Sequence, residues 1–308
     1  MDQPMDILRE FPVRKSKRQK SAFREAILSY GEELGYRCCV EKGSMGARNL
    51  VLGDPEKAKV LVTAHYDTCA RLPFLNLITP CSFWLFLGWQ LLLTAILCIP
   101  PGILGGLIGV LLDDRGLAVY AAYLLLLAEL ALMLVGPANR QNANDNTSGV
   151  VAALELARSL SAEDHERVCF VLFDLEEAGL WGSASYRKTH RKASNGQVIF
   201  NLDCVGEGDE ILLFPTKKAK KDRKLMELVK RCAFQKDGKS IIVQDHGFAI
   251  YPSDQTNFPV GFGVAAFCRS RWAGLYLAKI HTGKDRNLDE KNVALLREYL
   301  QMILSEQA

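Results

Sequence analysis

The chain has 308 residues, of which 49% are hydrophobic and 24% are charged, and this composition excludes a wholly disordered protein. The net charge is only +3, so nucleic acid is not expected as a partner, because phosphate binding needs a concentrated basic surface. The nine cysteines, an odd number without a C-x-x-C pair, argue against a secreted disulfide framework and favour a reducing compartment.

Outside an apolar block at residues 72–137, the sequence predicts alternating helices and strands. Hydrophobic residues recur at helical spacing over residues 22–35, and two short strands are expected at 38–41 and 48–52. Residues 59–64 (KVLVTA) form a nearly continuous apolar run, which is typical of a strand buried on both faces. The later elements are strands expected at 168–173, 198–202 and 265–268 and helices at 150–160, 222–235 and 289–306. This alternation predicts an α/β fold with a mostly parallel, mixed sheet and helices on both faces.

The apolar block is expected to be an inserted helical hairpin. Residues 81–99 carry no charge and residues 117–135 carry only Glu129, and a helix of either length can cross about 30 Å of hydrocarbon. Residues 100–102 (PPG) are expected to break the first helix, so that residues 103–112 either extend it beyond a kink or form a re-entrant piece. Because apolar residues cover every face of the helices, residues 81–135 are predicted to cross a lipid bilayer twice. The alternative is a soluble hairpin buried in a dimer interface, and oligomer formation through the hairpin remains open.

Charged residues beside the hairpin predict its orientation. Arg71 and Arg140 flank the two spans on the side of the remaining chain, whereas Arg115 lies in the polar tip at residues 113–115. A basic stretch at residues 14–20 adds positive charge to the first side. Because the cytoplasmic flanks of membrane spans are richer in lysine and arginine, the remaining chain is expected on the cytoplasmic face.

Side chains that can bind metal ions follow three of the predicted buried strands. The carboxyl ends of parallel strands form the active site in such sheets, so these side chains are expected to meet. They are His65 and Asp67 after residues 59–64, Glu176 and Glu177 after 168–173, and Asp203 after 198–202. Since His65 and Asp67 are two residues apart in extended chain, Asp67 is placed to accept the ring N–H of a metal-bound His65.

Two further segments add possible ligands. Asp145 lies in the segment at residues 144–149 (NDNTSG), and His281 lies in a loop before the last helix, where Asp285 is close enough to orient it. Two histidines and three carboxylates form a ligand set that suits zinc, and a shared carboxylate suits a two-metal site. Because the carboxylates would repel one another without cations, the cluster predicts two bound divalent ions, most simply Zn²⁺. His190, which stands among charged residues, is instead expected at the surface.

The order of these motifs resembles that of the di-zinc aminopeptidases of the M28 peptidase family. The motifs are H-x-D, N-D-N-x-S-G, E-E-x-G-L-x-G-S, N-x-D and H-T, at residues 65–67, 144–149, 176–183, 201–203 and 281–282. The resemblance covers residues 1–71 and 138–308 and implies one discontinuous zinc-peptidase domain with an aminopeptidase-like fold. The transmembrane hairpin, at residues 72–137, is then an insertion into that domain.

The resemblance also implies a role for each side chain. Two zinc sites would share Asp145, one completed by His65 and Asp203 and the other by Glu177 and His281. Glu176 would be the general base, and Asp67 would orient His65. The peptide bond between Asp145 and Asn146 is commonly cis in this family.

The implied function is the hydrolysis of peptide bonds by a metal-activated water, most simply the removal of N-terminal residues from short peptides by a membrane-anchored enzyme. Asp254 and Phe258 resemble a family segment that lines the substrate pocket, so both are predicted to bind the peptide substrate. Ile280 stands where many members carry a tyrosine that stabilises the tetrahedral intermediate. Two alternatives remain open: a single-zinc acyl-transfer enzyme similar to glutaminyl cyclases, and a non-catalytic receptor or scaffold built on a peptidase fold.

Overall fold

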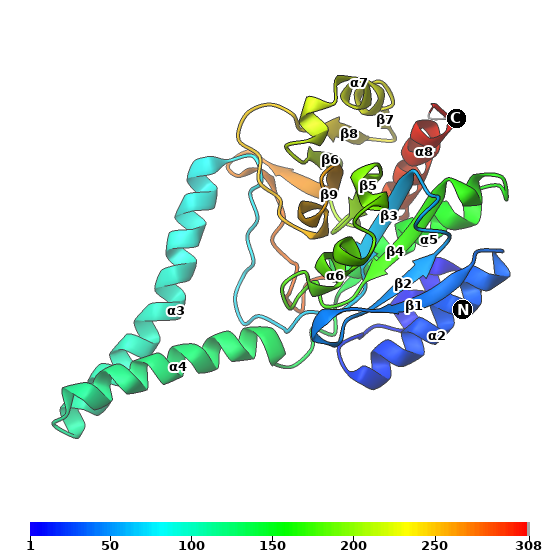
Figure 1. Cartoon of the computed structure of the whole chain (residues 1–308). Coiled ribbons are helices and arrows are strands. Elements are labelled where there is room, and N and C mark those ends of the chain that lie inside the picture. Colours follow the sequence, from blue (N-terminus) through cyan, green and yellow to red (C-terminus); the bar gives the residue numbers. More distant parts are fainter. Residues whose placement is uncertain (307–308) are drawn as a thin grey trace.

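In the computed structural model, which describes residues 1–306, a ten-stranded mixed sheet carries helices on both faces and a long apolar hairpin projects from it (Figure 1). The predicted fold class is therefore confirmed. The strands are β1 (Cys38–Lys42), β2 (Arg48–Leu52), β3 (Val60–His65), β4 (Val168–Phe173), β5 (Val198–Leu202), β6 (Glu210–Pro215), β7 (Gln235–Lys236), β8 (Lys239–Val243), β9 (Gly261–Ser270) and β10 (Gly274–Tyr276). The helices are α1 (Ile7–Glu10), α2 (Lys17–Glu33), α3 (Phe83–Leu111), α4 (Arg115–Val135), α5 (Gly149–Ser159), α6 (Trp181–Thr189), α7 (Arg223–Arg231) and α8 (Glu290–Glu306).

The sheet has a parallel centre and antiparallel flanks. Its strand order is β1-β2-β4-β3-β5-β9-β6-β8-β7, and β10 pairs with β9. The central strands β4, β3, β5 and β9 are parallel, whereas β2 is antiparallel to β4 and β6 is antiparallel to β9. The pairing of β3 with β4 runs in register from Val60 with Val168 to His65 with Phe173, so both strands end at the same edge.

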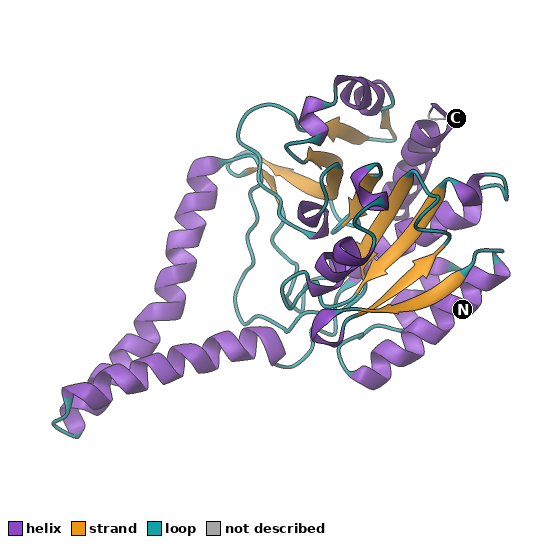
Figure 2. Ribbon diagram, viewed as in Figure 1, coloured by secondary structure: helices purple, strands orange, loops and turns teal. Residues whose placement is uncertain are grey.

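Alternate residues of β3 enter two different hydrophobic cores. Val60 and Val62 belong to a large core that includes side chains of α2, α5, α7 and α8. Leu61 belongs to a smaller core with Tyr186 of α6. Figure 2 shows the helices on both sides of the strands that result from this pattern. The strand is thus buried on both faces, as its apolar run predicts.

The hairpin of α3 and α4 extends away from the sheet (Figure 2). Most of its side chains are exposed. Gly105 and Gly109 of α3 lie against Ala118 and Ala122 of α4. A Cβ at Gly105 would lie 2.6 Å from the Ala118 carbonyl oxygen, so glycine permits this close packing. The helices, of 29 and 21 residues, are long and apolar enough to cross a membrane, a finding that rests on length and composition alone.

The expected break at residues 100–102 does not occur, because α3 continues through both prolines to Leu111. Pro100 and Pro101 lack the N–H groups that would bond the carbonyls of residues 96 and 97. The turns on either side keep their own hydrogen bonds, and the segment beyond the prolines packs through Gly105 and Gly109 on α4. Residues 103–111 therefore extend the first helix, which is the first of the two expected arrangements.

The inserted segment that contains the hairpin leaves and rejoins the sheet domain at one place. Ala70 pairs with Ala138, and the Arg71 N–H donates to the Pro137 carbonyl over 2.9 Å. Residues 71–82, which we call the strap, connect this point to the start of α3. Ile78 of the strap forms a backbone bridge with Leu277, just beyond β10. The strap therefore runs along the sheet domain rather than away from it.

The basic stretch at residues 14–20 supplies less free charge near the hairpin than its sequence suggests. Arg14 is fully buried, and Lys20 pairs with Asp174 over 2.5 Å inside the domain. Lys15 does reach the hairpin, where its Nζ donates to the Leu134 carbonyl at the end of α4 over 3.1 Å. The expectation that this stretch adds positive charge beside the spans is met only in part.

Candidate metal centre

The predicted metal-binding side chains meet at the carboxyl edge of the parallel strands. His65 is the last residue of β3, Asp203 directly follows β5, and Glu176 and Glu177 lie three and four residues beyond β4. Asp145 comes from the turn η3 (Ala143–Ser148), which leads into α5. The common strand ends thus place on one edge side chains that are far apart in the sequence.

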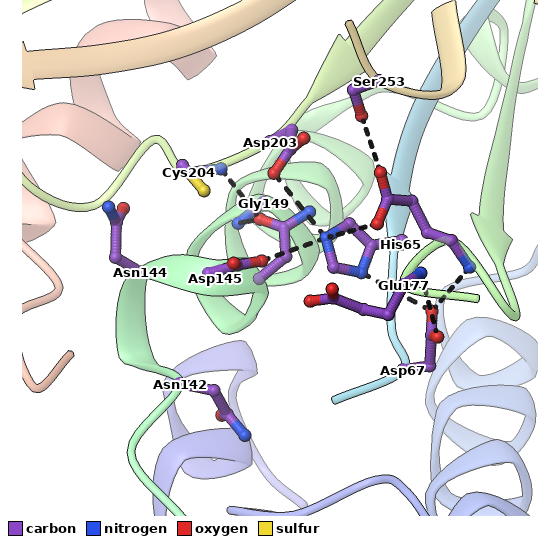
Figure 3. Close-up of polar contacts among 12 residues, drawn as sticks. His65, Asp67, Asn142, Asn144, Asp145, Gly149, Glu177, Asp203, Cys204 and Ser253 are labelled. Carbon is purple, nitrogen blue, oxygen red and sulfur yellow. Dashed lines mark hydrogen bonds and ion pairs between the residues drawn. The ribbon is translucent and has the colours of Figure 1, made fainter. Parts of the chain in front are cut away.

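Asp145 lies between the two histidines. Its Oδ1 is 3.2 Å from His65 Nε2, and its Oδ2 is 2.8 Å from His281 Nε2. On the first side, Asp203 Oδ1 lies 3.6 Å from His65 Nε2, and on the second side Glu177 Oε2 lies 3.4 Å from His281 Nε2. Figure 3 shows His65 joined to Asp145 and Asp203. The structure brings all five predicted ligands together in two groups that share Asp145, and their role as zinc ligands stays a prediction.

The residues at this edge fit a pair of divalent cations. In each group, one nitrogen or oxygen atom from every side chain lies within 4.8 Å of the others. Burial and the Asp145 charge raise the pKa of Glu177 to about 7, although His281 opposes the rise, and burial raises the pKa of Glu176 well above its ordinary value. Glu177 Oε1 is buried and finds no hydrogen-bond donor within residues 1–306. Histidine nitrogens and carboxylate oxygens suit zinc, which would relieve this crowding of acidic groups.

Asp67 contacts the His65 ring, as the sequence predicts, and also holds the turn that follows β4, which the sequence does not predict. Its Oδ1 lies 3.6 Å from His65 Nδ1, on the side of the ring away from Asp145, as expected for a residue that orients the imidazole (Figure 3). The same carboxylate accepts the backbone N–H groups of Glu176, over 3.0 Å, and Glu177, over 3.3 Å. Asp67 therefore also fixes the turn that carries both glutamates.

The segment at residues 144–149 is fastened to the end of β5. Asn146 donates to the Leu202 carbonyl over 2.9 Å, and its Oδ1 accepts the N–H groups of Gly149 and Cys204. A Cβ at Gly149 would clash with the Leu202 carbonyl oxygen, so only glycine fits there. The peptide bond between Asp145 and Asn146 is cis, which confirms the expectation drawn from the resemblance.

Asp285 does not orient His281, contrary to the expectation. Its carboxylate accepts the backbone N–H groups of Asn144 over 2.8 Å and of Asp145 over 3.0 Å. The Asp285 carboxylate is therefore engaged by the η3 turn. Asp285 thus holds the residue that lies between the two histidines.

Three further side chains lie near the centre, and of these the sequence points only to Ser253, which precedes Asp254 in the segment that resembles the family's substrate pocket. The buried Arg14 donates from Nε to the Tyr66 carbonyl over 2.6 Å and so supports the chain after β3. Ser253 donates to Glu176 Oε1 over 3.4 Å. Cys69 has its sulfur within 4.8 Å of the Glu177 and His281 donor atoms. Arg14 and Cys69 belong to no motif, although Cys69 stands only four residues after His65 in the sequence.

The two predicted substrate-binding residues do not line the cavity at the metal centre. Asp254 is fully buried, burial raises its pKa to about 7, and its carboxylate oxygens find no hydrogen-bond partner in the described chain. Phe258 packs in the small core, 6.0 Å from Phe173 between ring centroids. The cavity itself measures about 440 Å³, and its apolar wall consists of Ile78, Phe86, Ile250, Tyr251, Pro252 and Ile280.

Comparison with known proteins is consistent with this geometry. The sequence profile of Peptidase family M28 matches residues 123–303, more than half of the chain. Aminopeptidase YwaD of Bacillus subtilis is 42% identical over 67 residues, which make up 21% of this chain and only 15% of YwaD. His65 and Asp67 precede the residues that the profile matches.

Solved structures share the fold at low sequence identity. The LapA aminopeptidase of Legionella pneumophila gives a TM-score of 0.59 at 14% identity and covers 100% of this chain and 71% of LapA. The glutaminyl cyclase of Porphyromonas gingivalis gives a TM-score of 0.61 at 16% identity and covers 100% of this chain and 98% of the cyclase. At these identities the likeness establishes the fold and leaves the reaction open.

Proposed function

The chain belongs to peptidase family M28, and from that premise we propose that it is a zinc-dependent aminopeptidase anchored in a membrane by the α3–α4 hairpin. The observation that carries the catalytic part is the position of Asp145 between His65 and His281, each of which has a further carboxylate beside it. In this proposal Asp203 completes one zinc site with His65 and Asp145, and Glu177 completes the other with His281 and Asp145.

Glu176 is the proposed general base. When bound, two Zn²⁺ ions would lower the pKa of a water molecule and polarise the scissile carbonyl. Glu176 Oε2 lies 4.0 Å from His65 Nε2, Glu176 also groups with His65 and Glu177 within 4.8 Å, and Ser253 donates to the other carboxylate oxygen. Burial raises the pKa of Glu176, so this carboxylate can take a proton from the attacking water and return it to the leaving amine.

The charge of the cavity favours a free N-terminus. Asp145, Glu176, Glu177 and Asp203 line it, and within the described chain its lining includes no lysine or arginine. Three of these carboxylates are proposed zinc ligands, so Glu176 is the acidic side chain left to attract an α-amino group, which is positively charged near neutral pH. Acetylation would remove that charge.

One assay tests the catalytic proposal. We expect the detergent-solubilised protein to hydrolyse members of a panel of aminoacyl arylamides, to lose activity with a chelator and to contain two zinc ions per chain. N-acetylated arylamides should be poor substrates. Hydrolysis that is unaffected by chelation, or no hydrolysis of any member by zinc-loaded protein, would refute the proposal.

We propose that the hairpin lies in a membrane. Two features support this location: its apolar side chains are exposed, and Glu129, the charged residue within its spans, faces an interior cavity. Glu129 of α4 faces a cavity of about 380 Å³ between the helices and the strap, which Arg71 also lines, and its Oε2 is shielded from solvent. Ionisable groups within membrane spans face such interior spaces rather than lipid. Residues 72–137 would then form a transmembrane insertion in a catalytic domain made of residues 1–71 and 138–308, on the cytoplasmic face.

Extraction of cell membranes tests this location. The protein should stay in the pellet through an alkaline carbonate wash and enter solution only with detergent. A defined dimer purified without detergent would favour the soluble hairpin instead. Protease cleavage of the sheet domain in inverted but not in right-side-out vesicles would support the cytoplasmic face.

Glutaminyl cyclisation is the second candidate reaction, because the likeness to the Porphyromonas gingivalis cyclase extends over this whole chain. The two adjoining donor groups favour two metal ions, whereas the single-zinc reaction needs one. A chain with one zinc ion that releases ammonia from peptides with N-terminal glutamine would support the cyclase. A non-catalytic scaffold is disfavoured because all five proposed ligands and the proposed base are present together.

A further inference from the structure

The wall of the catalytic cavity includes a residue of the hairpin. Phe86, in the first turn of α3, lines the same cavity as His65, Glu176 and His281. Asn76 and Ile78 of the strap line it as well. The part of the chain that we assign to the membrane therefore begins at the edge of the cavity.

Contacts on both sides of the cavity hold this arrangement. The strap N–H of Leu72 donates to the His281 carbonyl over 2.8 Å, and the Ile250 N–H donates to the Pro80 carbonyl over 3.0 Å. Phe248 packs against two rings of α3, 5.3 Å from Phe83 and 6.0 Å from Phe86 between centroids. The first turn of α3 is thus fixed relative to the proposed zinc ligands.

Exposed aromatic side chains surround this edge. Trp84, in the first turn of α3, is 78% exposed. Trp272 is 90% exposed in the turn between β9 and β10, and Leu277, just after β10, pairs with Ile78 of the strap. Tryptophan favours the boundary between lipid hydrocarbon and water, because its ring is apolar and its N–H can meet water. With the hairpin in a membrane as proposed, Trp84 and Trp272 would lie at this boundary, near the start of α3 and the edge of the cavity.

We propose that the substrates are polypeptides with a free N-terminus that an apolar anchor holds at the bilayer surface, so that the N-terminus enters the cavity beside α3. This inference rests on the proposed function, both the peptidase reaction and the membrane location. Anchored substrates share a surface with the enzyme, which raises their effective concentration. Because the cavity lies at the boundary, a short segment between the N-terminus and the anchor is enough to reach the proposed zinc ligands.

Peptides of one N-terminal sequence test the inference with protein in phosphatidylcholine vesicles. One peptide is unanchored, and others carry a palmitoylated lysine or an apolar helix after spacers of about 5 or about 20 residues, which reach roughly 17 Å or 70 Å when extended. We expect kcat/KM for the short-spacer peptides to exceed that of the unanchored peptide about tenfold or more. Equal kcat/KM for palmitoylated and helix-anchored peptides would show that only the position of the peptide at the bilayer matters. A higher kcat/KM for one of them would show whether the natural anchor is a lipid or an apolar helix.

Three outcomes would overturn the inference. They differ in whether the proposed peptidase function is also refuted. Equal cleavage of anchored and unanchored peptides leaves the aminopeptidase in place and removes only the preferred substrate class. Cleavage of long-spacer peptides alone shows that the cavity lies away from the bilayer. If no peptide is cleaved, the proposed peptidase function falls as well.

A variant on the aromatic edge provides a further measurement. Trp272→Glu should lower the turnover of short-spacer peptides severalfold and leave aminoacyl-arylamide hydrolysis in detergent unchanged, because Trp272 does not line the cavity. Met45→Glu, at an apolar side chain that is 72% exposed outside the hairpin and strap, is the matched control and should change neither rate. Equal effects of the two substitutions would count against the position of the boundary.

Discussion

The metal centre and the hairpin depart from the usual burial pattern in opposite directions. The centre buries ionisable groups, since the side chains of His65 and Asp145 are only 1% and 4% exposed. The hairpin exposes apolar groups, among them Leu124 at 62% and Val110 at 81%. Crowded buried carboxylates and large exposed apolar surfaces are both costly in water. We interpret each region as completed by a partner outside the chain, cations in one case and lipid in the other.

The two regions also differ in how they should respond to substitution. The centre depends on single atoms held in place by single hydrogen bonds, as Asp67 and Asp285 show. The hairpin depends on a summed apolar area, to which each side chain adds a small share. Changes at the centre should therefore be large and specific, whereas changes in the hairpin should be graded and should depend on depth.

Glu176→Gln is expected to have the largest effect. Loss of the base should lower kcat/KM for an aminoacyl arylamide about 10²- to 10⁴-fold, whereas the zinc content should stay near two ions per chain because Glu176 is not a proposed ligand. Enzyme assays and elemental analysis measure the two quantities. Glu163→Gln, at an exposed position, should change neither. Retained turnover in the Glu176 variant would show that another group takes the proton.

A charged residue introduced in the middle of α4 should have the second-largest effect. Leu124→Arg should cost about 2.5–3.5 kcal/mol of membrane insertion and reduce the carbonate-resistant fraction of the protein. In a soluble hairpin the same substitution at an exposed site would change stability by only about 0.5 kcal/mol. Met45→Arg, outside the hairpin, should leave the fraction unchanged. Normal membrane retention of the Leu124 variant would contradict a lipid-facing α4.

A substitution in the packing behind the metal centre should have a smaller effect than the Glu176 and Leu124 substitutions. Gly149→Ala would force a Cβ against the Leu202 carbonyl oxygen and should cost about 1–3 kcal/mol in the free energy of unfolding, with weaker zinc retention because the η3 turn carries Asp145. Urea unfolding and zinc titration measure these changes. Gly196→Ala, where a Cβ would meet its nearest atom at 3.8 Å, is the control. Equal stability of the two variants would show that the turn can shift without loss.

The sequence predicts a region well when the interactions that form it join residues close together in the chain. The ends of β3, β4 and β5 were predictable because an apolar run followed by a polar residue is a local pattern, and parallel strands then bring the ligands together. The strands β6 and β8 were not anticipated, although both lie in the sheet.

The residues whose surroundings the sequence predicts wrongly depend on contacts between distant parts of the chain. Arg14 looks like part of a basic surface until the turn after β3 covers it, and the target of Asp285 is 140 residues away in the sequence. The resemblance of short segments predicts a pocket position for Asp254 and Phe258, but such a resemblance does not fix the depth of a side chain, and both are buried. The charged neighbours of His190 predict an exposed side chain, but the ring is buried between partners from β1 and the β2–β3 loop.

His190 gives the smallest predicted effect, and its dependence on pH has a definite sign. The ring lies 3.0 Å from Glu41 and 2.6 Å from Glu56, and the hydrogen bond to Glu41 raises its pKa despite burial, with Glu56 adding to the rise. A raised pKa means that the charged form stabilises the folded state. That stabilisation is complete below the ordinary pKa of about 6.5 and is lost as the pH rises through the raised value.

His190→Gln should therefore be less stable than the parent protein by up to about 1 kcal/mol near pH 6, and the difference should shrink toward pH 9. Urea unfolding of both proteins at matched zinc concentrations measures it. Glu41→Gln should show the same trend because it removes the first partner of the ring. A difference that is constant over this range would mean that His190 stabilises the domain by packing on Tyr186, 4.5 Å away between ring centroids, rather than by its charge.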